Sequence, residues 1–360
     1  MKIILTTGGT GGHIYPALAL AKSLKKDNDE NEILFIGTTN HMEKDIIEKS
    51  DFDFYGFKLN SGTKGKVDKL LQYFRLLFAT LKIYFKFLFD RPDLVMGFGA
   101  YISAPALLAA KFLNIDILLH EQNSSMGKVN KMMFKSAKDV IVCYESILED
   151  YDDKKVKLLG NPRASEVKDI EEDKEIFEQF NFSKNKKTIL MVMGSQGSES
   201  INDTMFDLLP QFTKEDYQVI YVTGSKHHHL FEKDESQTNV VVLPYVDQAQ
   251  MLANCDLVIA RGGATTAAEI CALGVPSIIV PSPYVANNHQ YTNAKQLAQK
   301  DASVIIREKD LNSKILFDSI SSIIYDDQKL ESMSKAAKSL AKENASKDIV
   351  NLINEYRNEE

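Results

Sequence analysis

The sequence predicts an α/β fold built from two Rossmann-like, doubly wound domains that face each other across a cleft. Short apolar, β-branched runs alternate with segments of helical spacing, and short connections join them. The pattern restarts at residues 188–198, where a second strand opens into a second glycine loop. With 360 residues, the chain is long enough for two domains, each with its own core.

The domain boundary is expected near residue 163. The sequence GNPR at residues 160–163 is typical of a turn that ends the preceding element, and an acidic, low-complexity stretch follows at residues 166–174. We therefore expect residues 1–162 to form a first domain and residues 163–335 a second. Residues 336–360 are expected to form a C-terminal helix that packs back toward the first domain.

Composition excludes several classes of protein. The chain is 44% hydrophobic and 26% charged, which is typical of a soluble globular protein, and its net charge of −7 argues against a general nucleic-acid binder. Cys143, Cys255 and Cys271 have no paired spacing, so we expect reduced thiols and a cytosolic protein. Neither a signal peptide nor a transmembrane run of about 18 apolar residues is present. Contact with a membrane surface stays possible.

The first candidate site lies where the first strand ends. An apolar strand at residues 2–7 runs into four glycines at residues 8–12, and a helical pattern follows. Glycines allow close approach of the backbone to a ligand, and a helix N-terminus favours a phosphate. His13 stands at that N-terminus, either as a cap or as a functional group.

Two further loops are expected at the same edge of the sheet. A strand at residues 93–97 leads into a second glycine loop that extends to Ser103, and a strand at residues 116–119 delivers the polar sequence HEQN at residues 120–123. Because open α/β sheets bind ligands at the carboxyl ends of their strands, these side chains indicate a binding site.

The stretch that organises the second half is residues 260–290. A buried strand is expected at residues 256–260, and the sequence Arg-Gly-Gly follows it at residues 261–263. A helix with two threonines in its first turn comes next. The N-terminus of such a helix attracts a diphosphate. Glu269, one turn further on, is placed to accept hydrogen bonds from a ribose diol, and the Gln290 side-chain amide can bind a sugar. The glycine turn alone fits an ordinary connection between a strand and a helix equally well, but the threonines, Glu269 and Gln290 that follow it favour a nucleotide-sugar site. Residues 244–247 are the expected wall for the base.

Residues 67–89 predict a long helix that is apolar on most of its circumference. Between residues 64 and 89 Asp68 alone opposes a set of basic residues, and this excess suits binding in the headgroup region of a bilayer. The alternative is a core helix whose lysines extend to water. We favour the membrane role. The basic residues are Lys64, Lys66, Lys69, Arg75, Lys82 and Lys86.

Two patterns that resemble metal sites are interpreted without a metal. Residues 51–53 match the DxD of metal-dependent glycosyltransferases, but two acidic residues at a helix end are weak evidence. Residues 227–229 are three adjacent histidines, which cannot all face one metal from a helix. We expect no metal and no cofactor, because helix N-termini and threonine hydroxyls can hold a diphosphate by themselves.

Taken together, six motifs resemble the MurG family of bacterial transferases, which move N-acetylglucosamine from UDP onto the undecaprenyl-pyrophosphoryl-muramyl-pentapeptide lipid. The resemblance runs from about residue 3 to residue 300, although GNPRAS is one residue shorter than the family's form and His289 replaces a glutamine. The motifs are GGTGGHIYPALALA, GFGAYISAP, HEQN, GNPR, GSQGSESIN and ARGGATTAAEI with NNHQYTNA.

The resemblance implies an enzyme of GT-B architecture, a UDP-N-acetylglucosamine-dependent hexosyltransferase with an inverting mechanism. His13 is the implied general base, and we expect Glu121 to orient it. The implied donor-binding residues are Thr10, Gly11, Gly12, Asn123, Arg163, Ser195, Val246, Ala264, Thr265, Thr266, Glu269 and Gln290. The implied acceptor or membrane residues are Gly97, Gly99, Tyr101, Ser103, Lys69, Arg75, Lys82 and Lys86.

The implied partners are UDP-N-acetylglucosamine, the lipid acceptor, an anionic membrane surface and cell-wall synthesis proteins, at the cytoplasmic face of the cell membrane. Two alternatives stay open at this point. One is a related transferase that glycosylates diacylglycerol, and the other is a non-catalytic subunit that binds a UDP-sugar.

Overall fold

The computed structural model describes residues 1–59, 66–194, 197–224, 228 and 239–358. Its contacts divide the chain into two compact units, one combining Met1–Ser165 with Asn344–Glu360 and the other comprising Glu166–Glu343. The first boundary falls at 165 rather than 162. The second falls at 343 rather than 335, because helix α13 (Asp327–Ser339) packs inside the second unit, where Ala337 is fully buried.

The first unit is a seven-stranded parallel sheet in the order β3-β2-β1-β4-β5-β6-β7. The order reverses between β1 and β4, which is the topological switch point of a Rossmann fold. Its strands are β1 (Lys2–Thr6), β2 (Glu32–Thr38), β3 (Asp53–Phe57), β4 (Leu94–Gly97), β5 (Asp116–Glu121), β6 (Asp139–Val142) and β7 (Val156–Leu158). Its helices are α1 (Gly11–Asp27), α2 (Met42–Glu48), α3 (Lys66–Phe89), η1 (Tyr101–Ser103), α4 (Ala104–Phe112), α5 (Lys128–Met133), η2 (Phe134–Ser136), α6 (Ser146–Asp150), α7 (Pro162–Val167), which crosses the boundary between the units, and α14 (Ala345–Asn358).

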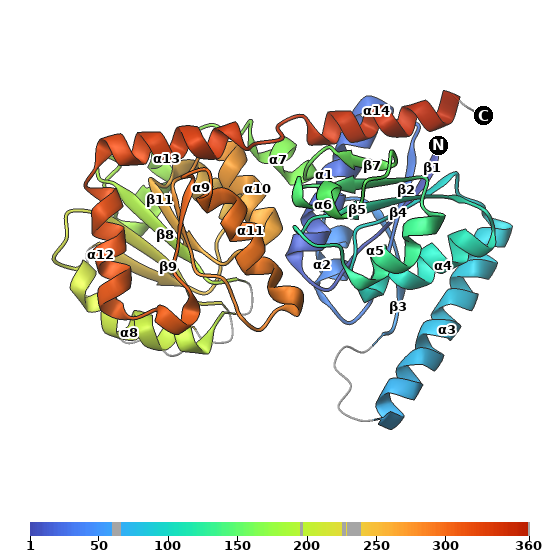
Figure 1. Ribbon diagram of the computed structural model, residues 1–360, viewed down its shortest axis with the longest axis horizontal. Helices are drawn as coiled ribbons and strands as arrows, with labels where there is room; N and C mark the ends of the chain where they lie inside the picture. Colours follow the sequence, from blue (N-terminus) through green and yellow to red (C-terminus); the bar gives the residue numbers. More distant parts are fainter. Residues whose placement is uncertain (60–65, 195–196, 225–227, 229–238, 359–360) are drawn as a thin grey trace. The chain divides into compact units, whose positions relative to one another are not determined.

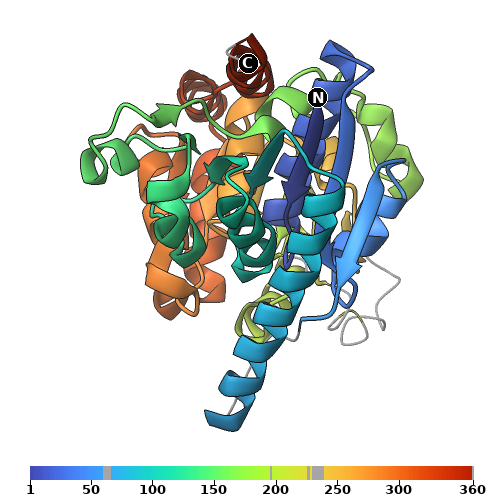
Figure 2. The same cartoon turned by 90° about the vertical axis from the view of Figure 1, so that its right-hand side faces the viewer.

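Helices cover both faces of this sheet (Figure 1). Along β1, Ile4 contributes to the cluster under α3, α4 and α5, whereas Ile3 and Leu5 contribute to the cluster under α1, α2 and α14. This alternation follows the period of two that side chains have along a strand. The N-terminal half of α3 projects beyond the other elements of its unit (Figure 2).

The second unit repeats the arrangement with a six-stranded parallel sheet in the order β10-β9-β8-β11-β12-β13. Helices α8 and α12 cover one face, and α9, α10 and α11 cover the other. The strands are β8 (Thr188–Val192), β9 (Gln218–Val222), β10 (Val240–Leu243), β11 (Leu257–Ala260), β12 (Ser277–Ile279) and β13 (Ser303–Ile305). The helices, besides α13, are η3 (Lys174–Phe180), α8 (Glu199–Phe212), α9 (Gln248–Asn254), α10 (Ala264–Leu273), η5 (Ala286–Asn288), α11 (His289–Ala298), η6 (Glu308–Asp310) and α12 (Ser313–Ile324).

Candidate active site

The glycine loop after β1 presents His13 at the start of α1. Thr10 is the extended N-cap residue of this helix, and its hydroxyl lies 3.1 Å from Nδ1 of His13. Gly11 and Gly12, two of the expected donor residues, form the first helical turn with His13. The helix therefore begins within the glycine loop, at Gly11, and the Thr10 hydroxyl fixes the orientation of the imidazole.

A buried carboxylate that the sequence analysis missed holds this loop in place. Glu43, on α2, is fully buried, and its carboxylate accepts from the Gly9 amide at 3.2 Å and from the Thr38 amide at 3.0 Å, and also from the Thr38 hydroxyl. A Cβ on Gly8 would lie 2.6 Å from the Glu43 carboxylate, so only glycine fits there. In the sequence, Glu43 looks like one more surface charge on a short helix.

The second glycine loop, after β4, meets the first. At Gly99, whose φ is +80°, a Cβ would lie 3.4 Å from the His13 ring and 3.7 Å from the side-chain oxygen Oε1 of Gln122. The Ser103 hydroxyl is buried and donates to the Gly99 carbonyl at 2.6 Å. Tyr101 and Ser103 form the short helix η1, and Gly97 closes β4 where a Cβ would lie 2.7 Å from Leu107. Three segments predicted separately therefore surround Gly99.

His120 is a buried, neutral member of the site. Its Nε2 donates to the Gly160 carbonyl at 3.0 Å, and its Nδ1 accepts from the Gln122 amide at 2.9 Å. The ring stacks on Phe98 with centroids 5.2 Å apart. Burial, followed by repulsion from His13, lowers the pKa of His120 to about 4 despite the Gly160 bond, so the imidazole is uncharged at neutral pH.

Glu121 is tied to the loop that follows it. One carboxylate oxygen accepts from the Asn123 amide and side chain at 3.1 and 3.2 Å, and the other accepts from the Gly127 amide at 2.7 Å and from Asn130 at 2.9 Å. Burial raises the pKa of Glu121, although these four bonds oppose the rise. We expected Glu121 to orient His13, but the hydroxyl found on His13 Nδ1 is that of Thr10. Glu121 instead positions Asn123.

Arg163 lies at the start of α7 within the first unit. Its guanidinium carbon lies 5.2 Å from the centre of the Tyr15 ring, and its backbone amide donates to the Asn161 side chain at 3.0 Å. The shortened GNPRAS turn therefore places this cation beside α1. The other expected donor residues in the described ranges lie at the N-cap and in the first turn of α1, after β5, or in the second unit.

In the second unit, the expected diphosphate and ribose residues share one helix start. Ala264, Thr265 and Thr266 open α10, and Glu269 follows one turn later with its side chain buried. Gln248, at the start of α9, donates to the Thr266 hydroxyl at 3.1 Å and to the Glu269 carboxylate at 2.6 Å. Sequence reasoning missed Gln248, whose only signal is its place two residues after Val246. Val246 is buried just before the Asp247 N-cap of α9.

Gln290 and the Arg261 turn complete this half-site. The Gln290 side-chain oxygen accepts from the Ser282 amide at 2.8 Å. A Cβ on Gly262 would lie 2.2 Å from the Gln290 carbonyl, so Gly262 allows α11 to approach β11. Arg261 forms an ion pair of 2.7 Å with Glu308 and donates to the Val280 carbonyl, which makes it a structural residue of the turn.

Several expected residues fall outside what can be described. Ser195, His227 and His229 lie outside the described residues, as does Lys64, and the side chains of Lys66 and Lys69 are not described. Within the described ranges no group of three or more His, Cys, Asp or Glu side chains could hold a metal ion. The three cysteines are free thiols, and burial raises the pKa of Cys271 to about 12.

Helix α3 forms over the predicted range, and one side of it packs on α4 and joins the core cluster of the first unit through Ala79, Ile83 and Phe87. Lys82 and Lys86 lie 5.3 and 5.2 Å from the centre of the Tyr55 ring, and Arg75 is exposed. Among the described residues, no helix has the length and apolar character needed to cross a bilayer. We call the exposed large apolar side chains of α3 the apolar face of α3. They are Leu70, Leu71, Tyr73, Phe74, Leu77, Phe78, Leu81, Phe85, Leu88 and Phe89.

Comparison with known proteins agrees with this architecture. Residues 3–142 match the glycosyltransferase family 28 N-terminal domain, and residues 188–353 match the glycosyltransferase family 28 C-terminal domain. The fold and the site thus define a two-domain glycosyltransferase of the GT-B class. The glycosyltransferase of kitacinnamycin has this fold as well, with a TM-score of 0.74 at 14% identity over 99% of this chain and 98% of its own.

Proteins that resemble this chain over its full length identify the family within the glycosyltransferase class. The UDP-N-acetylglucosamine–N-acetylmuramyl-(pentapeptide) pyrophosphoryl-undecaprenol N-acetylglucosamine transferase of Bacillus licheniformis is 37% identical over 99% of both chains. The Bacillus subtilis protein of the same name is 36% identical over 99% of this chain and 100% of its own. The crystal structure of Acinetobacter baumannii MurG has a TM-score of 0.76 at 25% identity, covering 98% of this chain and 99% of its own. The chain belongs to the MurG family.

Proposed function

We propose that this enzyme transfers N-acetylglucosamine from UDP-N-acetylglucosamine to the 4-hydroxyl of the muramyl sugar in undecaprenyl-pyrophosphoryl-muramyl-pentapeptide. The product is the disaccharide lipid used in peptidoglycan synthesis. The observation that carries the proposal is an identity of 35–38% to relatives of that name over at least 98% of the chain.

The second unit is proposed to bind the donor. The backbone N–H groups at the start of α10 and the hydroxyls of Thr265 and Thr266 face the diphosphate, because a helix N-terminus carries partial positive charge. Glu269, held at 2.6 Å by Gln248, accepts from the ribose diol. Gln290 contacts the sugar hydroxyls, and the Val246 backbone contacts the uracil edge.

The first unit is proposed to supply the base. The acceptor 4-hydroxyl attacks C1 of N-acetylglucosamine as the bond from C1 to the diphosphate oxygen breaks, so the configuration inverts. The hydroxyl proton passes to Nε2 of His13 and then to solvent. Imidazole suits this step because it exchanges protons near neutral pH, and the Thr10 hydroxyl at 3.1 Å from Nδ1 leaves Nε2 on the side that faces the Gly99 loop. Asn123, positioned by Glu121, contacts the transferred sugar.

Departure of UDP is proposed to need no metal. Negative charge that builds on the leaving diphosphate is stabilised by N–H groups and hydroxyls already oriented at the helix start. We expect the rate of UDP release to be unchanged, within about twofold, when EDTA replaces divalent cations. A loss of activity that Mg²⁺ or Mn²⁺ restores would contradict this part of the proposal.

The apolar face of α3 is proposed to rest on the anionic cytoplasmic surface of the cell membrane. Exposed aromatic and leucine side chains beside lysines are typical of interfacial helices. Phe74→Glu should reduce co-sedimentation with vesicles that contain phosphatidylglycerol. The control is Phe206→Glu, which changes an exposed phenylalanine on α8 of the second unit. Equal binding of both variants would contradict a role for α3.

The deciding assay measures UDP release from UDP-N-acetylglucosamine with and without a short-chain analogue of the muramyl-pentapeptide lipid. We expect release that depends on this acceptor. Release with diacylglycerol instead would favour the related lipid glycosyltransferase, and UDP binding without turnover would favour a non-catalytic subunit. His13→Ala should lower kcat by about 10²- to 10⁴-fold with unchanged UDP affinity. A loss below about threefold would identify another base.

A further inference from the structure

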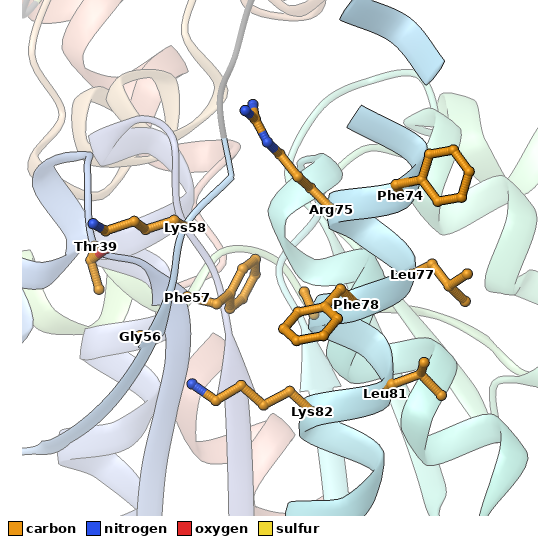
Figure 3. Close-up of a pocket in the computed structure, with 11 residues that line it drawn as sticks. Thr39, Gly56, Phe57, Lys58, Phe74, Arg75, Leu77, Phe78, Leu81 and Lys82 are labelled. Atoms are coloured by element: carbon orange, nitrogen blue, oxygen red, sulfur yellow. The ribbon is translucent and has the colours of Figure 1, made fainter. Parts of the chain in front are cut away.

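A groove with a volume of about 690 Å³ runs between the carboxyl end of β3 and helix α3 (Figure 3). Phe57 lies on its strand side and Phe78 on its helix side, and the two rings face the same space. Lys58, Arg75 and Lys82 line it as well. Its described lining contains no acidic residue. The groove thus combines an apolar interior with positive charge in a protein whose net charge is −7.

The groove opens at the same edge of the sheet as the proposed acceptor site. Thr39 directly follows β2 and Lys58 directly follows β3, while the glycine loop directly follows β1. In the sheet order β3-β2-β1, the groove is therefore two strand spacings from that loop, or about 10 Å. An acceptor whose sugar lies at the loop can extend its diphosphate toward the groove rim and its hydrocarbon chain into the groove.

Close packing of Gly56 and Thr39 leaves open space on the strand side of the groove. A Cβ on Gly56 would lie 2.2 Å from the Thr39 methyl, so glycine lets Thr39 pack flat across β3. On the opposite wall, the Phe78 side chain is 72% exposed, although its neighbour Ala79 is buried. A large aromatic side chain that borders an open apolar groove gains from covering by another apolar group.

We propose that this groove seats the first isoprene units of the acceptor's polyprenyl chain, with the basic side chains at its rim attracting the diphosphate that joins the chain to the sugar. The inference rests on the proposed function and deepens it, because it assigns the lipid part of the acceptor a binding site in the protein. A phospholipid of the bilayer would need no groove at the edge where the glycine loops lie, so the position favours the acceptor chain.

The test compares two soluble acceptors with the same sugar, peptide and diphosphate, one with a single isoprene unit and one with four, both below their micelle concentration and without detergent. We expect a wild-type KM about tenfold lower for the longer chain. Phe78→Ser should reduce that ratio to threefold or less, and Phe78→Leu, which keeps an apolar wall, should retain it. The matched control is Phe85→Ser, because Phe85 is 54% exposed on the same helix but does not line the groove.

Three outcomes would overturn the proposal: no chain preference in the wild type, equal loss in the Phe78→Ser and Phe85→Ser variants, or recovery of a low KM for the short acceptor by phosphatidylglycerol vesicles. If neither acceptor is glycosylated, the proposed function fails instead. In that case, titration calorimetry measures the affinities of the two acceptors without turnover. The same comparison of the Phe78 and Phe85 variants then decides whether the groove binds the hydrocarbon chain.

Discussion

At the scale of single residues, Ala100 stands out because its backbone is in a conformation that favours glycine. Its φ is 56° and its ψ is 159°, and the Ser103 hydroxyl holds the loop by donating to the carbonyls of Gly99 and Ala100. Strain of this kind costs about 1–3 kcal/mol, whereas glycine costs about 0.5–1 kcal/mol in unfolded-chain entropy.

Ala100→Gly should therefore raise the free energy of unfolding by about 1 kcal/mol, measured by urea denaturation. The matched control is Ala104→Gly at the start of α4, where φ is −56° and ψ is −43° and glycine should destabilise by about 0.5–1 kcal/mol. Equal destabilisation by the two substitutions would show that the loop carries no strain at Ala100.

His120 makes stability depend on pH. Because its folded pKa is about 4 against an ordinary 6.5, the unfolded chain binds a proton that the folded chain refuses, so stability falls as pH drops from about 6.5 to about 4. We expect His120 to account for about 2 kcal/mol of the loss between pH 7 and pH 5. His120→Gln should be less stable at pH 7 but should show a shallower decline. Parallel declines would contradict the assignment.

The neighbouring Glu121 acts in the opposite sense. Its folded pKa is raised, so the folded chain holds a proton that the unfolded chain has released, and stability rises as pH falls toward 4.5. For this reason the measurement compares the two proteins at each pH by denaturant unfolding, rather than the absolute slope of either one.

The positions of residues that define motifs could be predicted from the sequence, whereas the residues that support them could not. His13 and Thr266 follow glycine loops at strand ends, and the structure places each in the first turn of a helix, with Glu269 one turn further along α10. Glu43 holds the glycine loop through Gly9, 34 positions away, and Gln248 contacts α10 across 18 and 21 positions, so no spacing in the sequence identifies these two roles. Glu121 was identified, but its partners depend on the fold of the loop that follows.

At the scale of elements, the strands were predictable because parallel strands buried on both faces are continuous apolar runs. The strands expected at residues 2–7, 93–97, 116–119 and 256–260 each begin and end within two residues of those bounds. The short helices α5, α7 and α9 were not predicted, since six or seven residues are too few to establish a period. Yet α9 matters to the donor half-site, because it brings Gln248 to α10.

Gln248→Ala should weaken binding of UDP-N-acetylglucosamine by about tenfold. The substitution removes the donor at 2.6 Å from Glu269 and at 3.1 Å from Thr266, so the carboxylate loses the orientation proposed for the ribose. Titration calorimetry measures the effect. Gln250→Ala is the control on the same helix, since Gln250 enters the α9 cap through its backbone amide. Comparable losses in both variants would point to general loosening of α9.

At the scale of the whole molecule, the two parallel sheets were predictable from the repeated alternation of elements, and so was the return of the chain end to the first unit, but the residue at which the chain leaves the second unit was not. The sequence from residue 311 onward is charged and helical throughout. The structure divides it, with α12 and α13 in the second unit and α14 in the first. What decides the division is the burial of Ile349, Val350 and Ile353 against α1, a contact between opposite ends of the chain.

The first unit is therefore completed by the last residues of the chain. Ile353→Asp places a carboxylate in a fully buried position and should destabilise that unit by about 4 kcal/mol. Because the two units have separate cores, hydrogen exchange should accelerate in β1 and α1 while β8 and α8 keep their protection. Asn351→Asp adds a carboxylate at an exposed position of the same helix and should change neither. Equal loss of protection in both units after Ile353→Asp would mean that they unfold as one cooperative body.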